Sequence, residues 1–404
     1  MQRKSRDGIR LLTLRAVCRR GFDIGKKRLI YSIALQKSFP RSALMSRRSL
    51  LIPTMLLMIT TFVASQKVHQ PTLTPQDSDT TESLIAVSPV NPQVVWASGR
   101  NGTFTKTTDG GQTWHSGVVP GAETLQFRDV EGVSDKVAYL LSIGNGPDSR
   151  IYKTTDGGAT WSLQFQNQVA AAFYDCFAFW TPNRGLTHGD SVEGRFPDLR
   201  TTDGTTWIDI GDNLPPALTA EFSFASSGTC VATQGGQRAW IATGGASPSR
   251  VLATTDGGDT WDAYSTPLRG SESAGVFSVA FRNAKNGFIG GGDLGESVPP
   301  FPQTARSMDG GKTWTLTESQ PEIGTVFGVA YVQGTGSGSS GDHDKFSHGH
   351  AVVVTGPGGA AWTPDEGDTW YTLPGVTGYW GVGSAGPKAT WLVGPNGTIL
   401  KVSF

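Results

Sequence analysis

Lys106-Thr107-Thr108-Asp109-Gly110-Gly111-Gln112-Thr113-Trp114 is the stretch that decides the fold, because the chain repeats it. Close copies run from Asp156 to Trp161, Asp256 to Trp261 and Asp309 to Trp314, and looser copies from Asp203 to Trp207 and Asp365 to Trp370. Successive aspartates lie 47, 47, 53, 53 and 56 residues apart. A period in this range is typical of a propeller or a solenoid rather than of one irregular core.

The residue types in this phrase predict a turn followed by a strand. The Asp109 carboxylate can accept backbone N–H groups two or three residues on, and glycine takes the positive φ that a tight turn needs. Threonine and tryptophan favour a strand, where a large indole packs on a half-buried surface. We therefore expect the repeated acids and indoles to fasten turns and not to contact a substrate. They are Asp109, Trp114, Asp156, Trp161, Asp203, Trp207, Asp256, Trp261, Asp309, Trp314, Asp365 and Trp370.

A second marker gives the register independently. An aromatic residue recurs in a β-prone stretch that ends a few residues later at a glycine, namely Trp96, Tyr139, Trp240, Phe288 and Trp391. An aromatic residue at one structural position in each repeat favours packing between blades over stacking on a ligand.

The two markers divide the chain into units of four strands. The units begin near residue 84 and then cover about 125–165, 172–210, 221–264, 276–317 and 326–373. Residues 378–404 supply only three strands, and a strand near 68–73 can complete that last unit and leave no open edge. The sequence therefore predicts an all-β fold, a seven-bladed β-propeller of four-stranded antiparallel blades, closed by an N-terminal strand that completes the last blade.

The first 65 residues differ from the rest. Residues 1–50 hold 14 Lys and Arg against two acids, whereas the remainder holds 20 basic and 32 acidic residues. Residues 45–65 combine a basic start, an apolar run and small residues at the exit, which predicts a signal peptide cleaved near Ser65. Arg47-Arg48 leaves a twin-arginine route open. Residues 1–44 are interpreted as a basic extension, disordered or upstream of the true start at Met45, with a transit peptide as the alternative.

These features predict the compartment and exclude some partners. We expect residues 66–404 to form the propeller, exported to the periplasm or the extracellular space, as a monomer without a membrane span. The acidic folded part shows no basic stripe with interleaved aromatic residues, so nucleic-acid binding is not expected.

Cysteine and histidine raise two further questions. Cys176 and Cys230 occupy comparable places in consecutive repeats, so they either bridge neighbouring blades or remain two small buried residues, and we expect the latter. An insertion at 334–349 contains Asp342-His343-Asp344, and zinc or nickel binding competes there with a solvated loop. Its spacing fits no closed site, so we expect no metal and no cofactor.

The phrase resembles the Asp-box, or bacterial neuraminidase repeat, which reads Ser/Thr-x-Asp-x-Gly-x-Thr-Trp. Together with the Gly-rich second strands and the export signal, it makes residues 83–404 most similar to the photosystem II stability/assembly factor group and its non-photosynthetic bacterial relatives. The repeat also occurs in sialidases, xyloglucanases and sorting receptors, so the resemblance implies a fold and leaves activity open.

The resemblance also implies where a site should lie, because family propellers carry the Asp-boxes on the face opposite the functional one. The functional mouth is then built by the starts of the first strands and by the loops between second and third strands. The charged residues at those places are Arg128, Asp129, Asp175, His188, Asp190, Glu193, Arg195, Glu221, Arg250 and Asp293. We expect the arginines to form ion pairs with Asp129, Glu193 and their neighbours.

Two functions fit these residues. The first is a non-enzymatic exported propeller, similar to an assembly factor, that binds a protein or glycan partner through the polar mouth. The second is an extracellular glycoside hydrolase, sialidase-like or xyloglucanase-like, that uses two of Asp175, Asp190 and Glu221 as its carboxylates. The Arg-Ile-Pro phrase and the Tyr-Glu pair of sialidases are absent from the sequence, so we favour binding.

Overall fold

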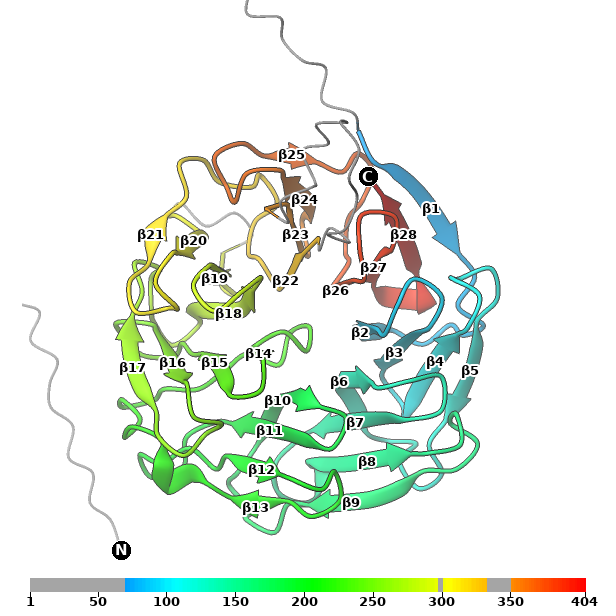
Figure 1. Ribbon diagram of the computed structural model, residues 1–404, viewed down its shortest axis with the longest axis horizontal. Helices are drawn as coiled ribbons and strands as arrows, with labels where there is room; N and C mark the ends of the chain where they lie inside the picture. Colours follow the sequence, from blue (N-terminus) through cyan, green and yellow to red (C-terminus); the bar gives the residue numbers. More distant parts are fainter. Residues whose placement is uncertain (1–69, 297–300, 333–349) are drawn as a thin grey trace, which may run out of the picture. The chain divides into compact units, whose positions relative to one another are not determined.

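The computed structural model describes residues 70–296, 301–332 and 350–404. The predicted extension and signal peptide, and the insertion at 334–349 with its histidines, lie outside the described residues. The described chain folds into seven four-stranded antiparallel sheets arranged around one centre (Figure 1). The predicted seven-bladed β-propeller is confirmed.

Each blade is a meander whose first strand lies innermost. Blades 1 and 2 comprise β2 (Leu84–Pro89), β3 (Val95–Gly99), β4 (Thr103–Thr107), β5 (His115–Val118), β6 (Gln126–Gly132), β7 (Ala138–Ile143), β8 (Arg150–Thr154) and β9 (Ser162–Gln166). Blades 3 and 4 comprise β10 (Tyr174–Thr181), β11 (Arg184–Gly189), β12 (Leu199–Thr201), β13 (Ile208–Asp209), β14 (Val231–Gln234), β15 (Arg238–Ala242), β16 (Arg250–Thr254) and β17 (Asp262–Ser265).

Blades 5 and 6 comprise β18 (Ala274–Phe281), β19 (Gly287–Asp293), β20 (Thr304–Ser307), β21 (Thr315–Leu316), β22 (Gly328–Tyr331), β23 (Val352–Gly356), β24 (Gly359–Thr363) and β25 (Tyr371–Thr372). Blade 7 comprises β26 (Gly381–Ser384), β27 (Thr390–Val393), β28 (Ile399–Ser403) and β1 (Thr72–Gln76). The helices among the described residues are three 3-10 turns, η1 (Gly146–Asp148), η2 (Gly211–Asn213) and η3 (Pro395–Gly397), and none is long and apolar enough to cross a membrane.

The N-terminal strand closes the ring as predicted. In Figure 1 the blue β1 runs beside the red β28 at the outer edge of blade 7. The two strands pair antiparallel from Thr72 opposite Ser403 to Gln76 opposite Ile399. The strand lies a few residues later than the predicted 68–73, because Gln76 is needed at its end: the Gln76 Oε1 accepts from the indole N–H groups of Trp114 and Trp391, each at 3.1 Å.

The hydrophobic core lies between the faces of adjacent blades. The five second-strand aromatic residues are 0–1% exposed, as the predicted packing requires. Trp96, for example, packs in one cluster with Phe127 and Leu140 of the next blade. Its indole N–H also donates to the Ser134 carbonyl of blade 2 at 2.8 Å. Large flat side chains therefore fill the wedge between blades that a twisted sheet leaves open.

The prediction for the two cysteines was wrong. Cys176 on β10 and Cys230, just before β14, form a disulfide, with Cα atoms 5.9 Å apart. The first strands of neighbouring blades run side by side at this point, and both residues are fully buried. Burial and pairing are therefore not alternatives here, because the bond lies inside the core between blades 3 and 4.

Candidate functional site

The meander separates two faces of the propeller. In each blade the loop from the first to the second strand and the loop from the third to the fourth strand leave from one face, and the remaining connections leave from the other. The Asp-box turns lie between third and fourth strands, so we name their side the box face. The other side, formed by the loops between second and third strands and by the connections between blades, is the mouth face.

The Asp-box acids bond within their own turns. The Asp109 carboxylate accepts the Thr113 N–H at 2.9 Å, the Thr113 hydroxyl at 2.6 Å and the Thr107 hydroxyl at 2.8 Å. Equivalent bonds form at the other acids, which are Asp156, Asp203, Asp256, Asp309 and Asp365. These bonds lower the pKa of the Asp156 carboxyl to about 2, the Thr160 hydroxyl contributing most. The following indoles are buried or half-buried at Trp114, Trp161, Trp207, Trp261, Trp314 and Trp370.

A cavity of about 330 Å³, the mouth cavity, opens on the mouth face near the centre. Its floor is aromatic: Phe224 and Phe277 stack with ring centroids 3.7 Å apart, and Phe327 follows at 5.9 Å from Phe277. Trp380 extends this cluster, 5.4 Å from Phe327. A neighbouring cavity of about 340 Å³ shares Phe327 and the 58% exposed Leu294 with it, so the two form one apolar surface.

An irregular segment of blade 4, residues 222–229, builds much of this floor. Its hydroxyls at Ser226 and Ser227 donate to the Phe327 carbonyl of blade 6 at 3.1 and 2.6 Å. Figure 1 shows the chain before β14 reaching toward the centre of the ring. Sequence reasoning missed this floor. The signal was present as two similar phrases, Val276 to Phe281 (VFSVAF) and Val326 to Tyr331 (VFGVAY), which place a phenylalanine at the start of two first strands.

Arg128 forms one side of the mouth cavity. Its Nη1 donates to the Ala225 carbonyl at 3.0 Å, its Nη2 to the Gln126 side chain at 3.2 Å, and its guanidinium lies 5.2 Å from the centroid of Trp380. Burial lowers its pKa to about 10. The Nε atom is buried and has no partner. The expected ion pair with Asp129 does not form, because Asp129 is turned toward backbone N–H groups.

Asp175 and Asp190 form the opposite, acidic side of the cavity. The two carboxyl groups act on each other: Asp190 helps to raise the pKa of Asp175, so Asp175 favours the protonated form. Burial raises the pKa of both, and the pKa of Asp175 lies well above its usual range. The Asp190 Oδ1 also accepts the Ser223 N–H at 3.1 Å, whereas the buried Asp175 Oδ2 has no partner in the hydrogen-bond network.

Two other predicted mouth residues, Asp129 and His188, are buried in structural contacts. Asp129 is 4% exposed and accepts the N–H groups of Val130 and Phe177, each at 2.8 Å, across blades 2 and 3. His188 is fully buried, and its Nδ1 lies 2.7 Å from Asp198 Oδ1. The pKa of the Asp198 carboxyl is raised by burial, against the opposing effect of His188.

Glu221 and Arg250 form the best-satisfied ion pair. The Arg250 Nε donates to Glu221 Oε1 at 2.8 Å and its Nη2 to Oε2. The same carboxylate accepts from the Thr243 hydroxyl and the Leu218 N–H, each at 2.7 Å. With 1% of the Glu221 side chain exposed, no acceptor is left for a ligand.

Three predicted residues remain, and none of them lines the mouth cavity. Arg195 bonds to Asp209 and Asp212, both at 2.6 Å, instead of the expected Glu193. Glu193 is exposed and has a φ of 53°, because it turns the chain back to Arg195. Asp293 accepts the Ser273 hydroxyl at 2.6 Å and borders the neighbouring cavity. Of the ten predicted residues, Arg128, Asp175 and Asp190 line the mouth cavity.

One of the three carboxylates predicted for a glycosidase, Glu221, is not available to a substrate. Glycosidases hold two carboxyl groups about 5 to 10 Å apart across the sugar. Glu221 is saturated by its partners, which leaves Asp175 and Asp190, and burial raises the pKa values of both. Among the described residues, no group of three His, Cys, Asp or Glu side chains could hold a metal ion.

Comparison with known proteins supports the fold. No protein-family model matches the chain, and no curated protein sequence matches it. Among solved structures it is similar to YCF48 bound to D1 peptide, with a TM-score of 0.58 and 15% identity over 84% of this chain and 96% of that one. It is also similar to YCF48 from Cyanidioschyzon merolae, with a TM-score of 0.54 and 16% identity over 82% and 98%. The predicted likeness to photosystem II assembly factor propellers is therefore confirmed for the fold.

Proposed function

We propose that this protein is a non-enzymatic binding propeller that holds a segment of a polypeptide partner in the mouth cavity. The observation that carries the proposal is the composition of this cavity. Its floor is a continuous aromatic surface, and Arg128, Asp175 and Asp190 bring polar groups to its sides. Apolar area with a few polar groups beside it is the usual composition of a binding pocket, in which the polar groups orient the ligand.

A polypeptide fits this composition better than a glycan does. An apolar side chain can cover the rings, while backbone N–H and C=O groups bond to the polar side chains that line the cavity, Arg128, Asp175 and Asp190. The similar YCF48 structure with its D1 peptide supports peptide binding as a use of this fold. Export remains part of the proposal, and the Cys176–Cys230 disulfide supports it, because such bonds persist in oxidising compartments.

The proposal can be tested with a random peptide library and a glycan array, both applied to the full purified protein. We expect peptide ligands whose affinity falls at least tenfold in Leu294→Asp, which places a charge on the exposed edge of the apolar surface. Ile208→Asp is the matched control, because Ile208 is 50% exposed on the outermost strand of blade 3. Equal affinity in both variants, or glycan hits without peptide hits, would overturn the proposal.

A further inference from the structure

At five of the seven junctions between blades, a cation on the third strand bonds to the next blade on the box face. Lys106, three residues before the Asp-box acid, lies 4.9 Å from the Trp96 ring centroid and donates to the Gly157 carbonyl of the next blade at 2.9 Å. Lys153 and Lys401 do the same toward the carbonyls of Gly204 and Gly110, at 3.0 and 2.9 Å. Arg200 and Arg306 also reach the next Asp-box, at the carbonyls of Gly257 and Glu366.

The junction of blades 4 and 5 lacks this cation, because Ala253 occupies its position. In place of the cation, the Trp240 indole N–H donates to the carbonyl of the next Asp-box, at Gly310, over 2.8 Å. Trp240 stacks on Phe281 at 3.5 Å and is 1% exposed, so its ring offers no platform to a guest. The space that a long side chain fills elsewhere remains as a cavity of about 320 Å³, the junction cavity.

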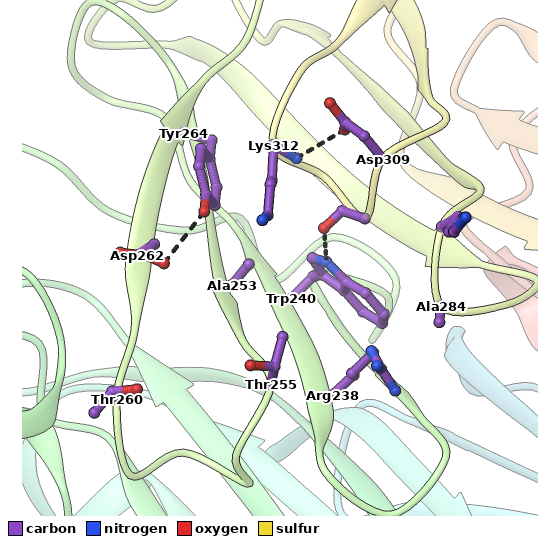
Figure 2. A pocket seen from close by; sticks show the side chains of 12 residues that line it. Arg238, Trp240, Ala253, Thr255, Thr260, Asp262, Tyr264, Ala284, Asp309 and Lys312 are labelled. Carbon is purple, nitrogen blue, oxygen red and sulfur yellow. Dashed lines mark hydrogen bonds between the residues drawn. The ribbon is translucent and has the colours of Figure 1, made fainter.

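Three cations from other positions line the junction cavity. Arg238 comes from the start of β15, Lys285 from the loop after β18 and Lys312 from the blade 5 Asp-box. None of them forms a salt bridge with any described residue. Figure 2 shows Lys312 extending between Tyr264 and Trp240, above Ala253, with Arg238 at the lower end. Three cations without a salt bridge stand out here because residues 51–404 carry 20 basic and 32 acidic side chains.

Two carboxylates also line the junction cavity, so its three cations leave an excess of one positive charge, and neither carboxylate forms a salt bridge with them. Asp309 is held by its own Asp-box, where it accepts from the Thr313 N–H at 2.9 Å and from the Thr313 hydroxyl at 2.6 Å. Asp262, opposite Ala253 in the sheet, accepts from the Tyr264 hydroxyl at 3.2 Å. Dispersed ammonium and guanidinium donors around a recess are the groups that bind carboxylate, phosphate or sulfate oxygens.

We propose that the junction cavity binds an oxyanion, and that Arg238, Lys285 and Lys312 hold it. The anion is either a free inorganic ion or an acidic side chain of a partner, which share this chemistry. The site lies on the box face, so it does not depend on the proposed function of the mouth.

The test follows the Trp240 indole N–H signal by NMR, assigned through Trp240→Phe, while sodium sulfate, sodium phosphate or the peptide acetyl-Glu-Glu-amide is added to the full protein at constant ionic strength. We expect a saturable shift that weakens at least tenfold in Lys285→Gln and in Lys312→Gln. Lys136→Gln is the matched control and should bind as the wild type does. Lys136 and Lys285 occupy the same place, since their carbonyls accept the Gly157 and Gly310 N–H groups at 2.8 Å, but the Lys136 junction is filled by Lys106.

Two further variants keep the test decisive. Asp262→Asn removes a negative charge and should strengthen binding, whereas Ala253→Trp, the residue found at this position in blade 6, should fill the cavity and abolish it. Saturation by sulfate or phosphate alone assigns a free ion, and tighter binding of the peptide assigns an acidic partner. Shifts that do not saturate, that are equal in Lys285→Gln and Lys136→Gln, or that arise with acetyl-lysine-amide instead would overturn the proposal.

Discussion

The Asp-box turns are stabilised by contacts between residues close in sequence, whereas the mouth is stabilised by contacts between residues far apart in sequence. In each turn an aspartate near the surface bonds to groups two to four residues away. Around the mouth, contacts join distant parts of the chain: Arg128 reaches Ala225 across 97 residues, and Asp129 reaches Phe177 across 48. The pKa of the turn acid Asp156 is lowered by hydrogen bonds, whereas burial raises the pKa values of Asp129, Asp175 and Asp190. Aspartate therefore stabilises a local turn on the box face, whereas on the mouth face it is buried and links distant segments of the chain.

The largest expected effect is at the Glu221–Arg250 pair on the mouth face. Arg250→Ala leaves the Glu221 carboxylate buried without its cation, so we expect the free energy of unfolding to fall by about 3 to 5 kcal/mol. Urea denaturation measures it. The control is Arg195→Ala, because the Arg195 side chain is 40% exposed and exposed ion pairs contribute about 0 to 1 kcal/mol. Equal losses in the two variants would show that burial does not set the contribution of an ion pair in this protein.

Removal of the disulfide between Cys176 and Cys230 is expected to have the next largest effect on stability. Cys176→Ser with Cys230→Ser removes a link across 54 residues, and we expect a loss of about 2 to 5 kcal/mol. Wild-type protein unfolded in urea with dithiothreitol should show the same midpoint as the double variant. If unfolded, unreduced wild-type protein instead reacts with a thiol reagent at both cysteines, the bond is absent.

The local contacts explain why the fold could be predicted from the sequence and most of the site could not. An Asp-box is complete within nine residues, so its residue types reveal the turn, and its period reveals the number of blades. Arg128 and Asp175 could be placed on the mouth face because strand order alone decides it. Their partners depend on the path of residues 222–229 across the centre, which no local pattern specifies. Glu221 was therefore taken for an available acid, although Arg250, Thr243 and Leu218 already saturate it.

The pair of Asp175 and Asp190 should give stability a pH dependence opposite to that of the turns. The raised pKa of Asp175 means that the folded state keeps a proton that the unfolded state releases above pH 4 or thereabouts. Stability then falls as pH rises from that point toward the folded pKa, by at most about 1.4 kcal/mol per pH unit for one proton. Asp175→Asn keeps the neutral form and should lose this slope in urea titrations between pH 5 and 8.

Because neighbouring charges also affect this pair, that experiment must compare the pH dependence of the variant with that of the wild type. Asp190, Asp198, His188 and Arg128 act on the pair, so the relevant quantity is the difference in slope between wild type and variant, not the slope itself. A variant that is stabilised equally at every pH would show that Asp175 is ionised in the folded protein.

The smallest expected effect is in a single turn. Asp309→Ala removes the bonds from the Thr313 N–H and hydroxyl, but both groups can bond to water at this exposed site, so we expect a loss of about 1 kcal/mol. Because the pKa of Asp309 is lowered by these bonds, its contribution is present above the unfolded pKa and disappears as pH falls below it. Urea midpoints of the variant and the wild type should therefore converge on acidification toward pH 3. A loss of stability as large as that of Arg250→Ala would mean that one Asp-box turn is coupled to the whole ring. The two faces would then differ in the chemistry of their contacts but not in the distance over which those contacts act.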